Sequence, residues 1–153
     1  MIYFRIDNRL IHGQVIEAWL PYTGARHLIV ANDALAGDIM RQQIISLAIP
    51  QRVEVHFVPV SDLAETLEHS GNDTFVLFEK CGDAFTAFSN GINMPSLNIG
   101  NLHYQEGKHQ LLPHVAVSAE EENQLMEMRG ANVLLDFRCI PTENTRGLDV
   151  RFS

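Results

Sequence analysis

The chain has 153 residues, the usual size of one domain, and at this length it needs no disulfide or metal to form a core. Apolar residues make up 46% and charged residues 20%, which excludes a disordered chain, and no apolar run is long enough to span a membrane. The net charge is −8, with +1 in residues 1–52 and −9 in the rest. Because binding along nucleic acid requires a basic surface, we expect no nucleic-acid partner, while the N-terminal segment leaves room for one small anion site.

The first ten residues lack the basic and then apolar layout of a secretion signal, which predicts a cytoplasmic protein. In that compartment Cys81 and Cys139 are expected as free thiols. Nothing in the composition divides the chain, so we expect one domain over residues 1–153.

Seven short segments rich in Val, Ile, Leu and Phe are expected to be strands: residues 2–6, 27–31, 52–57, 74–78, 96–99, 114–117 and 132–138. Five amphipathic segments between them predict helices: residues 13–22, 36–48, 62–69, 83–89 and 119–129. Gly24 is expected to end the first helix, which Trp19 packs onto the sheet. Ser118 and Glu121 predict a capping box at the start of the last helix.

Strands separated by helices imply right-handed crossovers, so we predict an α/β fold with an open, doubly wound, mostly parallel sheet of about six to seven strands and helices on both faces. Only residues 99–114 join two predicted strands without a helix. We expect that loop to turn one strand antiparallel or to carry site residues. Ligands of such folds bind at the carboxyl ends of strands, in the loops that lead into helices.

The loop after the first strand is the most heavily loaded with polar groups, reading Arg5-Ile6-Asp7-Asn8-Arg9-Leu10-Ile11-His12-Gly13-Gln14-Val15. The backbone amides of Gly13, Gln14 and Val15 are expected to be unpaired donors at the helix start that face a bound anion. Gly13 lets that backbone approach an anion closely. The loop therefore predicts an anion site.

Three side chains of this loop suggest phosphate chemistry. Arg9 offers a planar, permanently charged fork for phosphate oxygens, and the positive helix end favours a neutral, exposed His12. Asp7 is expected to orient Arg9 or to hold the imidazole in one tautomer. Phosphoryl transfer through a phosphohistidine requires such an imidazole beside anion donors. The residues alone leave two alternatives open: a surface histidine without a chemical role, or a domain that binds a small anion or nucleotide without covalent chemistry.

The same string closely resembles the signature of the mannose/sorbose-family IIB components of the bacterial sugar phosphotransferase system, R-x-D-x-R-L-I-H-G-Q-V. Weaker similarity continues in residues 27–33, 75–78, 96–100 and 107–108. Length and element order match over essentially the whole chain. The resemblance implies a doubly wound α/β phosphocarrier.

What the resemblance implies is a protein-N(pi)-phosphohistidine–sugar phosphotransferase component. A IIA phosphohistidine donates to His12 at Nδ1, and His12 passes the phosphoryl group to a sugar taken up by the IIC and IID membrane components. Arg9 and Asp7 complete the catalytic set, and no cofactor or metal is expected. The residues expected to bind the phosphate are Arg5, Gly13, Gln14 and Val15. A regulatory phosphoacceptor without sugar transfer is the alternative; the sugar and any homo-oligomer are left open.

Two further features bear on the site. Glu79 and Cys81 occupy a loop where the family often has a small polar or basic residue and a proline. We expect Glu79 to pair with Lys80 or an arginine rather than to face the phosphate. Three histidines of the C-terminal half lack a carboxylate or cysteine at ligand spacing, which predicts no metal there: His103, His109 and His114.

Overall fold

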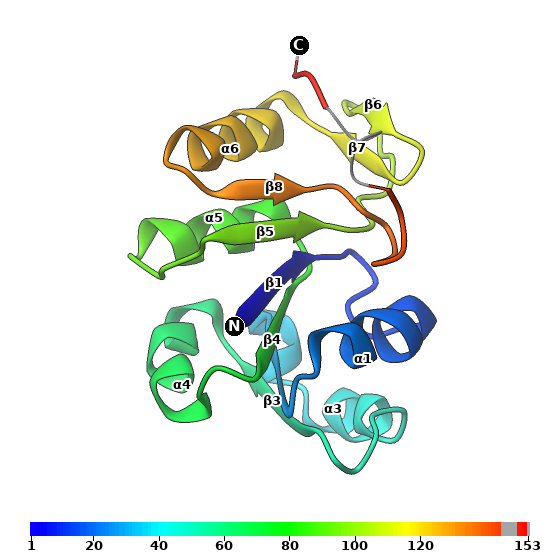
Figure 1. Ribbon diagram of the computed structural model, residues 1–153, viewed down its shortest axis with the longest axis vertical. Helices are drawn as coiled ribbons and strands as arrows, with labels where there is room; N and C mark the ends of the chain where they lie inside the picture. Colours follow the sequence, from blue (N-terminus) through cyan, green and yellow to red (C-terminus); the bar gives the residue numbers. More distant parts are fainter. Residues whose placement is uncertain (145–149, 153) are drawn as a thin grey trace.

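The main sheet has six parallel strands in the order β3-β2-β4-β1-β5-β8 (Figure 1). The computed structural model describes residues 1–144 and 150–152. The strands are β1 (Ile2–Ile6), β2 (His27–Ala31), β3 (Glu54–Val58), β4 (Thr74–Phe78), β5 (Ser96–Ile99) and β8 (Leu134–Asp136). Strand β4 is wholly buried, as its apolar sequence predicts for a strand covered on both faces. The predicted α/β class is confirmed.

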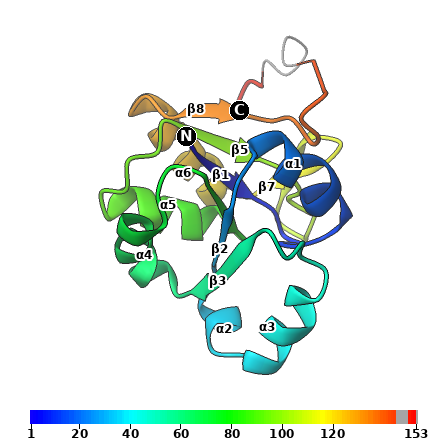
Figure 2. The same cartoon turned by 60° about the horizontal axis from the view of Figure 1, so that its bottom comes forward.

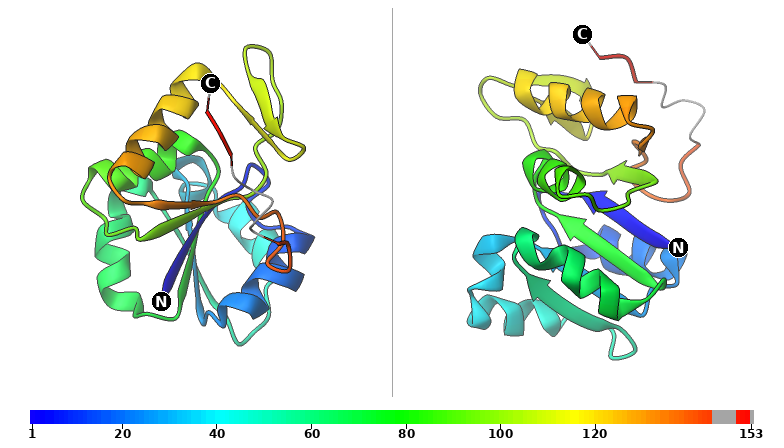
Figure 3. Two further views of the ribbon diagram at one scale, coloured as in Figure 1. Left: turned by 45° about the horizontal axis from the view of Figure 1, so that its top comes forward. Right: turned by 90° about the vertical axis from the view of Figure 1, so that its left-hand side faces the viewer.

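Helices cover both faces of the sheet, as Figure 2 and the two views of Figure 3 show. On one face lie the π-helical η1 (Val15–Trp19), α1 (Leu20–Thr23), α2 (Asp33–Ala36) and α3 (Ile39–Ser46). On the other lie η2 (Val60–Asp62), α4 (Leu63–Ser70), α5 (Cys81–Ser89) and α6 (Ala119–Gly130). Among the described residues, no helix is long and apolar enough to cross a membrane.

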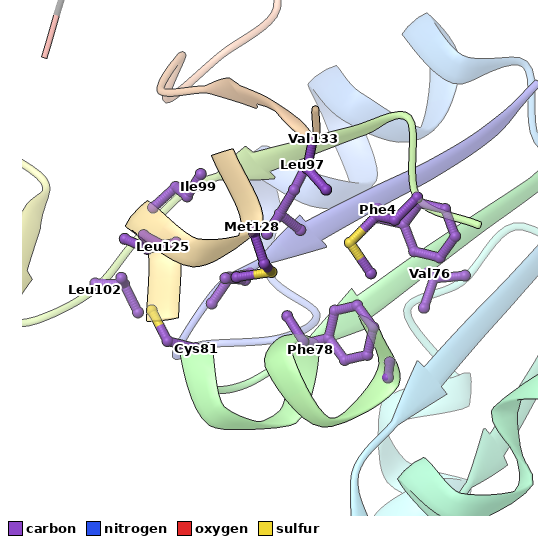
Figure 4. Packing of buried hydrophobic residues seen from close by; sticks show 14 of the residues in the cluster. Phe4, Val76, Phe78, Cys81, Leu97, Ile99, Leu102, Leu125, Met128 and Val133 are labelled. Carbon is purple, nitrogen blue, oxygen red and sulfur yellow. The ribbon is translucent and has the colours of Figure 1, made fainter. Parts of the chain in front are cut away.

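Each face of the sheet carries its own core, because side chains alternate along the strands. Phe4, Val76, Phe78 and Leu97 pack under α5 and α6 in the larger core, which Figure 4 shows together with Cys81, Leu125 and Met128. The smaller core lies under the first helix and contains Trp19, Leu20, Leu28 and Phe75. Trp19 is 2% exposed, which confirms its predicted packing role.

Helix ends follow the predicted signals. Gly24 ends the first helix in the left-handed conformation, with φ of 64°. Ser118 accepts a hydrogen bond from the amide of Glu121, whose side chain accepts one from the Ser118 amide, so the predicted capping box is present.

The second predicted helix differs from the single helix expected over residues 36–48. It divides at Gly37, because Asn32 caps α2 and the Asp38 side chain accepts a hydrogen bond from the amide of Arg41 to begin α3. Helix α3 buries none of its residues. The apolar side chains exposed along and after it are Ile39, Met40, Ile44 and Leu47.

Strands β6 (His109–Leu112) and β7 (Val115–Val117) pair antiparallel in a separate hairpin. The sequence predicts the second as a strand but misses the first, because half of its residues are polar and none is buried. The strand predicted over residues 114–117 is therefore present, but it lies outside the main sheet, whose strands are all parallel, and its antiparallel partner comes from the loop of residues 99–114 itself.

Candidate functional site

The loop after β1 leaves the sheet at its centre. The amide of Asp7 donates to the carbonyl of Phe78 at the end of β4, 2.8 Å away. On the other side, the amide of Gly100 donates to the carbonyl of Ile6, and the amide of Asn8 donates to that of Asn101, both at 2.8 Å. The carboxyl ends of β1, β4 and β5 therefore meet at Asp7, at the edge of the sheet where such folds bind ligands.

A tight turn reverses the chain after Asp7. The Asp7 carbonyl accepts a hydrogen bond from the amide of Leu10 at 2.9 Å, and its Oδ1 accepts one from the amide of Arg9 at 2.9 Å. An aspartate that bonds its own backbone two residues on is a common turn former. Leu10 has a positive φ of 55° while its side chain is buried, a conformation that costs about 1–3 kcal/mol in a residue other than glycine. This turn brings His12 back over Asp7.

Asp7 is completely buried, and one of its oxygens accepts hydrogen bonds from three other residues of the site. Oδ2 accepts from His12 Nε2 at 2.8 Å, from Arg5 Nη2 at 2.9 Å, and from Asn101 Nδ2 at 2.9 Å. Burial raises the pKa of this carboxyl, but the hydrogen bond from His12, the charge of Arg5 and the bond from Asn101 outweigh it and hold the pKa below its ordinary value. Asp7 is therefore an ionised acceptor.

The carboxylate fixes the tautomer of His12. An ionised carboxylate only accepts, so the hydrogen of the neutral imidazole lies on Nε2 and its lone pair lies on Nδ1. In the described part of the chain, Nδ1 is a buried atom with no hydrogen-bond partner. The expectation that His12 is exposed is wrong: the residue is 9% exposed, because the bond to Asp7 draws the ring inward.

Arg5 lies behind the carboxylate rather than in front of the histidine. Its side chain is fully buried, bonds Asp7 through Nε and Nη2, donates from Nη1 to Asn98 Oδ1, and stands 5.0 Å from the centre of the Trp19 ring. Arg5 is a residue expected to bind phosphate, and the structure instead places its charge where it compensates Asp7.

Gly100 makes room for that guanidinium. A Cβ atom built on Gly100 would lie 2.3 Å from Arg5 Cζ and Nη2, far inside ordinary contact. A glycine is required here for a close approach rather than for a turn.

The anion donors expected from the sequence have no partner among the described residues. Within residues 1–144 and 150–152, the amides of Gly13, Gln14 and Val15 donate no hydrogen bond, whereas that of Ile16 donates to the His12 carbonyl. The Arg9 side chain is exposed, and it forms no ion pair or hydrogen bond with the residues that the structure describes. These groups are free to bind an anion.

The family model for the PTS system sorbose subfamily IIB component matches residues 1–152. The chain belongs to this family. It is 29% identical over 145 residues to the N-acetylgalactosamine-specific phosphotransferase enzyme IIB component 2 of Escherichia coli, covering 94% of this chain and 92% of the relative. It is 27% identical over 146 residues to the fructose-specific EIIB component of Bacillus subtilis, covering 94% and 90%.

Solved structures agree with this assignment. The IIBSor domain of the sorbose permease from Klebsiella pneumoniae superposes with a TM-score of 0.85 at 28% identity, covering 94% of this chain and 91% of that one. The resemblance drawn from the sequence and the phosphotransferase class of the chain are confirmed.

The loop after β4 in this IIB chain contains an ion pair. Glu79 lies 4.0 Å from Lys80 Nζ, and its other oxygen accepts from Asn32 Nδ2 at 3.4 Å. The expected pairing of Glu79 with Lys80 is confirmed at the limit of an ion-pair distance. Cys81 is wholly buried in the larger core, where burial raises the pKa of its thiol, so it stays protonated.

Four residues of the IIB site are missed by reasoning from the sequence. Asn98 accepts from Arg5, and Asn101 bonds both Asp7 and Gln14 Oε1. Asn8 donates to the Glu79 carbonyl and accepts from the amide of His103, so it joins three loops. Cys139 donates to Gln14 Oε1 at 3.6 Å. An asparagine between two buried apolar residues of a strand, as at Asn98, is the one signal that could have pointed here.

The three histidines judged unable to bind a metal have other partners or lie apart. His109 Nε2 lies 2.9 Å from Glu122, and His114 Nε2 lies 2.8 Å from the Phe137 carbonyl. His103 is exposed and lines a cleft of about 610 Å³ together with Asn8, Lys108 and other residues.

Proposed function

We propose that His12 Nδ1 is the phosphoryl acceptor of this IIB chain. The observation that carries the proposal is the difference between the two ring nitrogens of His12. Nε2 is hydrogen-bonded to Asp7 at 2.8 Å, whereas Nδ1 has no partner among the described residues. In the transfer, the Nδ1 lone pair forms a bond to phosphorus while the bond between phosphorus and the IIA histidine breaks. The bond from Nε2 to the ionised Asp7 stabilises the positive charge that the ring gains.

Asp7 and Arg5 act as positioning residues in this proposal. Asp7 keeps the His12 ring in the tautomer whose lone pair lies on Nδ1. Arg5 keeps Asp7 ionised and in place from the side away from His12. Asn101 and Asn98 complete the frame by bonding Asp7 and Arg5. A fixed frame of this kind lowers the cost of aligning the nucleophile.

Arg9 and the first amides of the helix are proposed to hold the phosphoryl oxygens. The amides of Gly13, Gln14 and Val15 point from a helix start, where negative charge is favoured. Arg9 supplies an exposed guanidinium from the same loop. Because Nδ1 is covered in this structure, the IIA donor reaches it after the neighbouring side chains shift.

The partners follow from family membership. We propose that the whole chain, residues 1–153, is one IIB domain in the cytoplasm that receives phosphate from a IIA protein and delivers it to a sugar at IIC and IID components. A mannose-specific EIIAB relative of Escherichia coli, 28% identical over 142 residues, supports the IIA partnership. The relatives are specific for N-acetylgalactosamine, fructose and sorbose at 27–29% identity, so the sugar is left open.

Labelled phosphoenolpyruvate tests the proposal. The chain is incubated with the general phosphotransfer proteins and a IIA partner, and acid-labile label is counted on wild type, His12→Ala and His103→Ala. We expect label on wild type and on the control His103→Ala, and none on His12→Ala. Label on His12→Ala would show that another residue is the acceptor. No label on wild type would support non-covalent anion binding instead.

A further inference from the structure

Two histidines and a glutamate converge at the opposite end of the sheet from His12. His27 is the first residue of β2, and Glu54 and His56 belong to β3. The strand register pairs His27 with Glu54, and Glu54 and His56 are two residues apart on one strand. Side chains at these positions point to the same face of a sheet. It is the face of Ile29 and the larger core.

The spacing of these groups suits a shared cation better than direct hydrogen bonds. His27 Nδ1 lies 3.7 Å from one Glu54 oxygen, and His56 Nε2 lies 3.5 Å from the other. Strong hydrogen bonds between such groups are about 2.7–2.9 Å long. Ligands about 2.0–2.1 Å from a tetrahedral zinc ion stand roughly 3.4 Å apart. Each ring nitrogen lies near this spacing from one carboxylate oxygen, a different oxygen for each histidine.

We propose that His27 Nδ1, a Glu54 carboxylate oxygen and His56 Nε2 form a binding site for a divalent transition metal such as Zn²⁺. Their ligand atoms lie within 4.8 Å of one another, and no other group of three such side chains does so in residues 1–144 and 150–152. His27 Nδ1 is itself a buried atom without a hydrogen-bond partner. An imidazole nitrogen of this kind is an available ligand.

The surroundings of the three ligands leave room for a metal ion and a fourth ligand. A cleft of about 410 Å³ holds all three ligands and is closed on one side by α4, which contributes Glu65 and His69. The ligand atoms of these two side chains are not within 4.8 Å of all three others, so solvent completes a four-coordinate site. The nearest arginine in the sequence, Arg26, is 79% exposed and lies 3.9 Å from Asp73, outside the residues that line the cleft.

The site would tie the edge of the sheet together. Strand β3 is the outermost strand of the sheet, and within the part of the chain that the structure describes it pairs only with β2. A metal held by His27, Glu54 and His56 adds a second connection between the two strands. Its role is structural, because His27 and Glu54 are the first residues of their strands, whereas His12 follows the carboxyl end of β1.

Cobalt substitution tests the site, since Co²⁺ in a tetrahedral protein site gives strong visible absorption. The chelator-treated protein is titrated with Co²⁺ and then with Zn²⁺ in four forms: wild type, His56→Asn, Glu54→Gln and the control His103→Asn. We expect a one-to-one tetrahedral spectrum that Zn²⁺ displaces in wild type and His103→Asn. We expect the tetrahedral spectrum to be lost in His56→Asn and in Glu54→Gln. The Glu54 side chain is largely exposed, so the protein tolerates its replacement by glutamine.

Thermal unfolding gives a second readout. At a free Zn²⁺ concentration about 100-fold above Kd, the Tm of wild type should rise by roughly 5–10 °C, and that of His56→Asn should not. A His12→Asn variant that keeps the cobalt spectrum separates this site from the phosphoryl site. Absence of the spectrum in wild type, its survival in both His56→Asn and Glu54→Gln, or its loss in His12→Asn would overturn the proposal.

Discussion

Replacing Gly100 by alanine should disturb the site through Arg5. The added Cβ would stand 2.3 Å from Arg5 Cζ and Nη2, whereas carbon atoms in ordinary contact are about 3.5–4.0 Å apart. The guanidinium must therefore move by more than an ångström. Its bonds to Asp7 and Asn98 and its contact with Trp19 oppose that movement.

The loss of stability depends on whether the packing around Gly100 is strained or the Arg5–Asp7 ion pair is separated. Overpacking a well-packed interior costs about 1–3 kcal/mol, and separating a buried ion pair costs about 3–5 kcal/mol. Because both members of the ion pair remain present and the guanidinium can keep part of its pairing, only part of the second cost applies, and we expect the free energy of unfolding of Gly100→Ala to fall by about 2–4 kcal/mol. For a chain of this size, that corresponds to a drop in Tm of roughly 4–16 °C.

Urea unfolding at neutral pH measures the change, and Gly82→Ala is the matched control. Gly82 lies in α5 with no atom within 4 Å of a built Cβ, so alanine there should be neutral or stabilising by up to about 1 kcal/mol. Gly100→Ala should also accept phosphate at least tenfold more slowly, because Asp7 no longer holds His12 in register. Equal stability of the two alanine variants would refute the packing role assigned to Gly100 and Arg5.

Three other substitutions test separate parts of the site. Arg9→Ala should slow phosphoryl transfer roughly ten- to hundredfold, which corresponds to the loss of a charge-assisted contact of about 1.5–3 kcal/mol. The Tm should stay unchanged, because the Arg9 side chain is exposed and unpaired among the described residues. An unchanged rate would mean that Arg9 does not contact phosphate. The pKa of Asp7 is lowered on folding, so its stabilisation is full above the unfolded value of about 3.9 and is lost as pH falls through the folded one. Urea unfolding should therefore show a stability gap between wild type and Asp7→Asn that narrows below about pH 4, and a constant gap would contradict the ionised carboxylate. Glu79→Gln should leave the lifetime of phosphorylated His12 unchanged, because Lys80 and Asn32 already engage the carboxylate, and a several-fold longer lifetime would show that Glu79 faces the phosphate.

Local signals predict much of the fold. The apolar runs of β1, β2 and β4 give the strand limits to the residue, and the cap signals at Gly24 and Ser118 mark helix ends correctly. Both kinds of signal arise from neighbours in the chain. The exposure of Ile39 and Met40 is different, because the amphipathic pattern does not say which helix the sheet leaves uncovered.

The residues of the site also fall into those that local sequence predicts and those that depend on distant contacts. Asp7, Arg9 and His12 share one loop, and their residue types alone indicate phosphate chemistry. The inward position of Arg5 and the frame around Asp7 depend on partners more than ninety residues away: Asn98, Gly100 and Asn101. Contacts across that separation follow from strand order, which no local pattern specifies.

The position of the phosphoryl group on the ring of His12 tests the central claim most directly. The chain is labelled with ¹⁵N-histidine, phosphorylated, and analysed by phosphorus–nitrogen coupling in NMR at a pH where the phosphohistidine is stable. The geometry predicts phosphorus bonded to Nδ1 and a proton retained on Nε2, because Asp7 Oδ2 accepts from Nε2 at 2.8 Å. Phosphorus bonded to Nε2, or to any residue other than His12, would contradict the account.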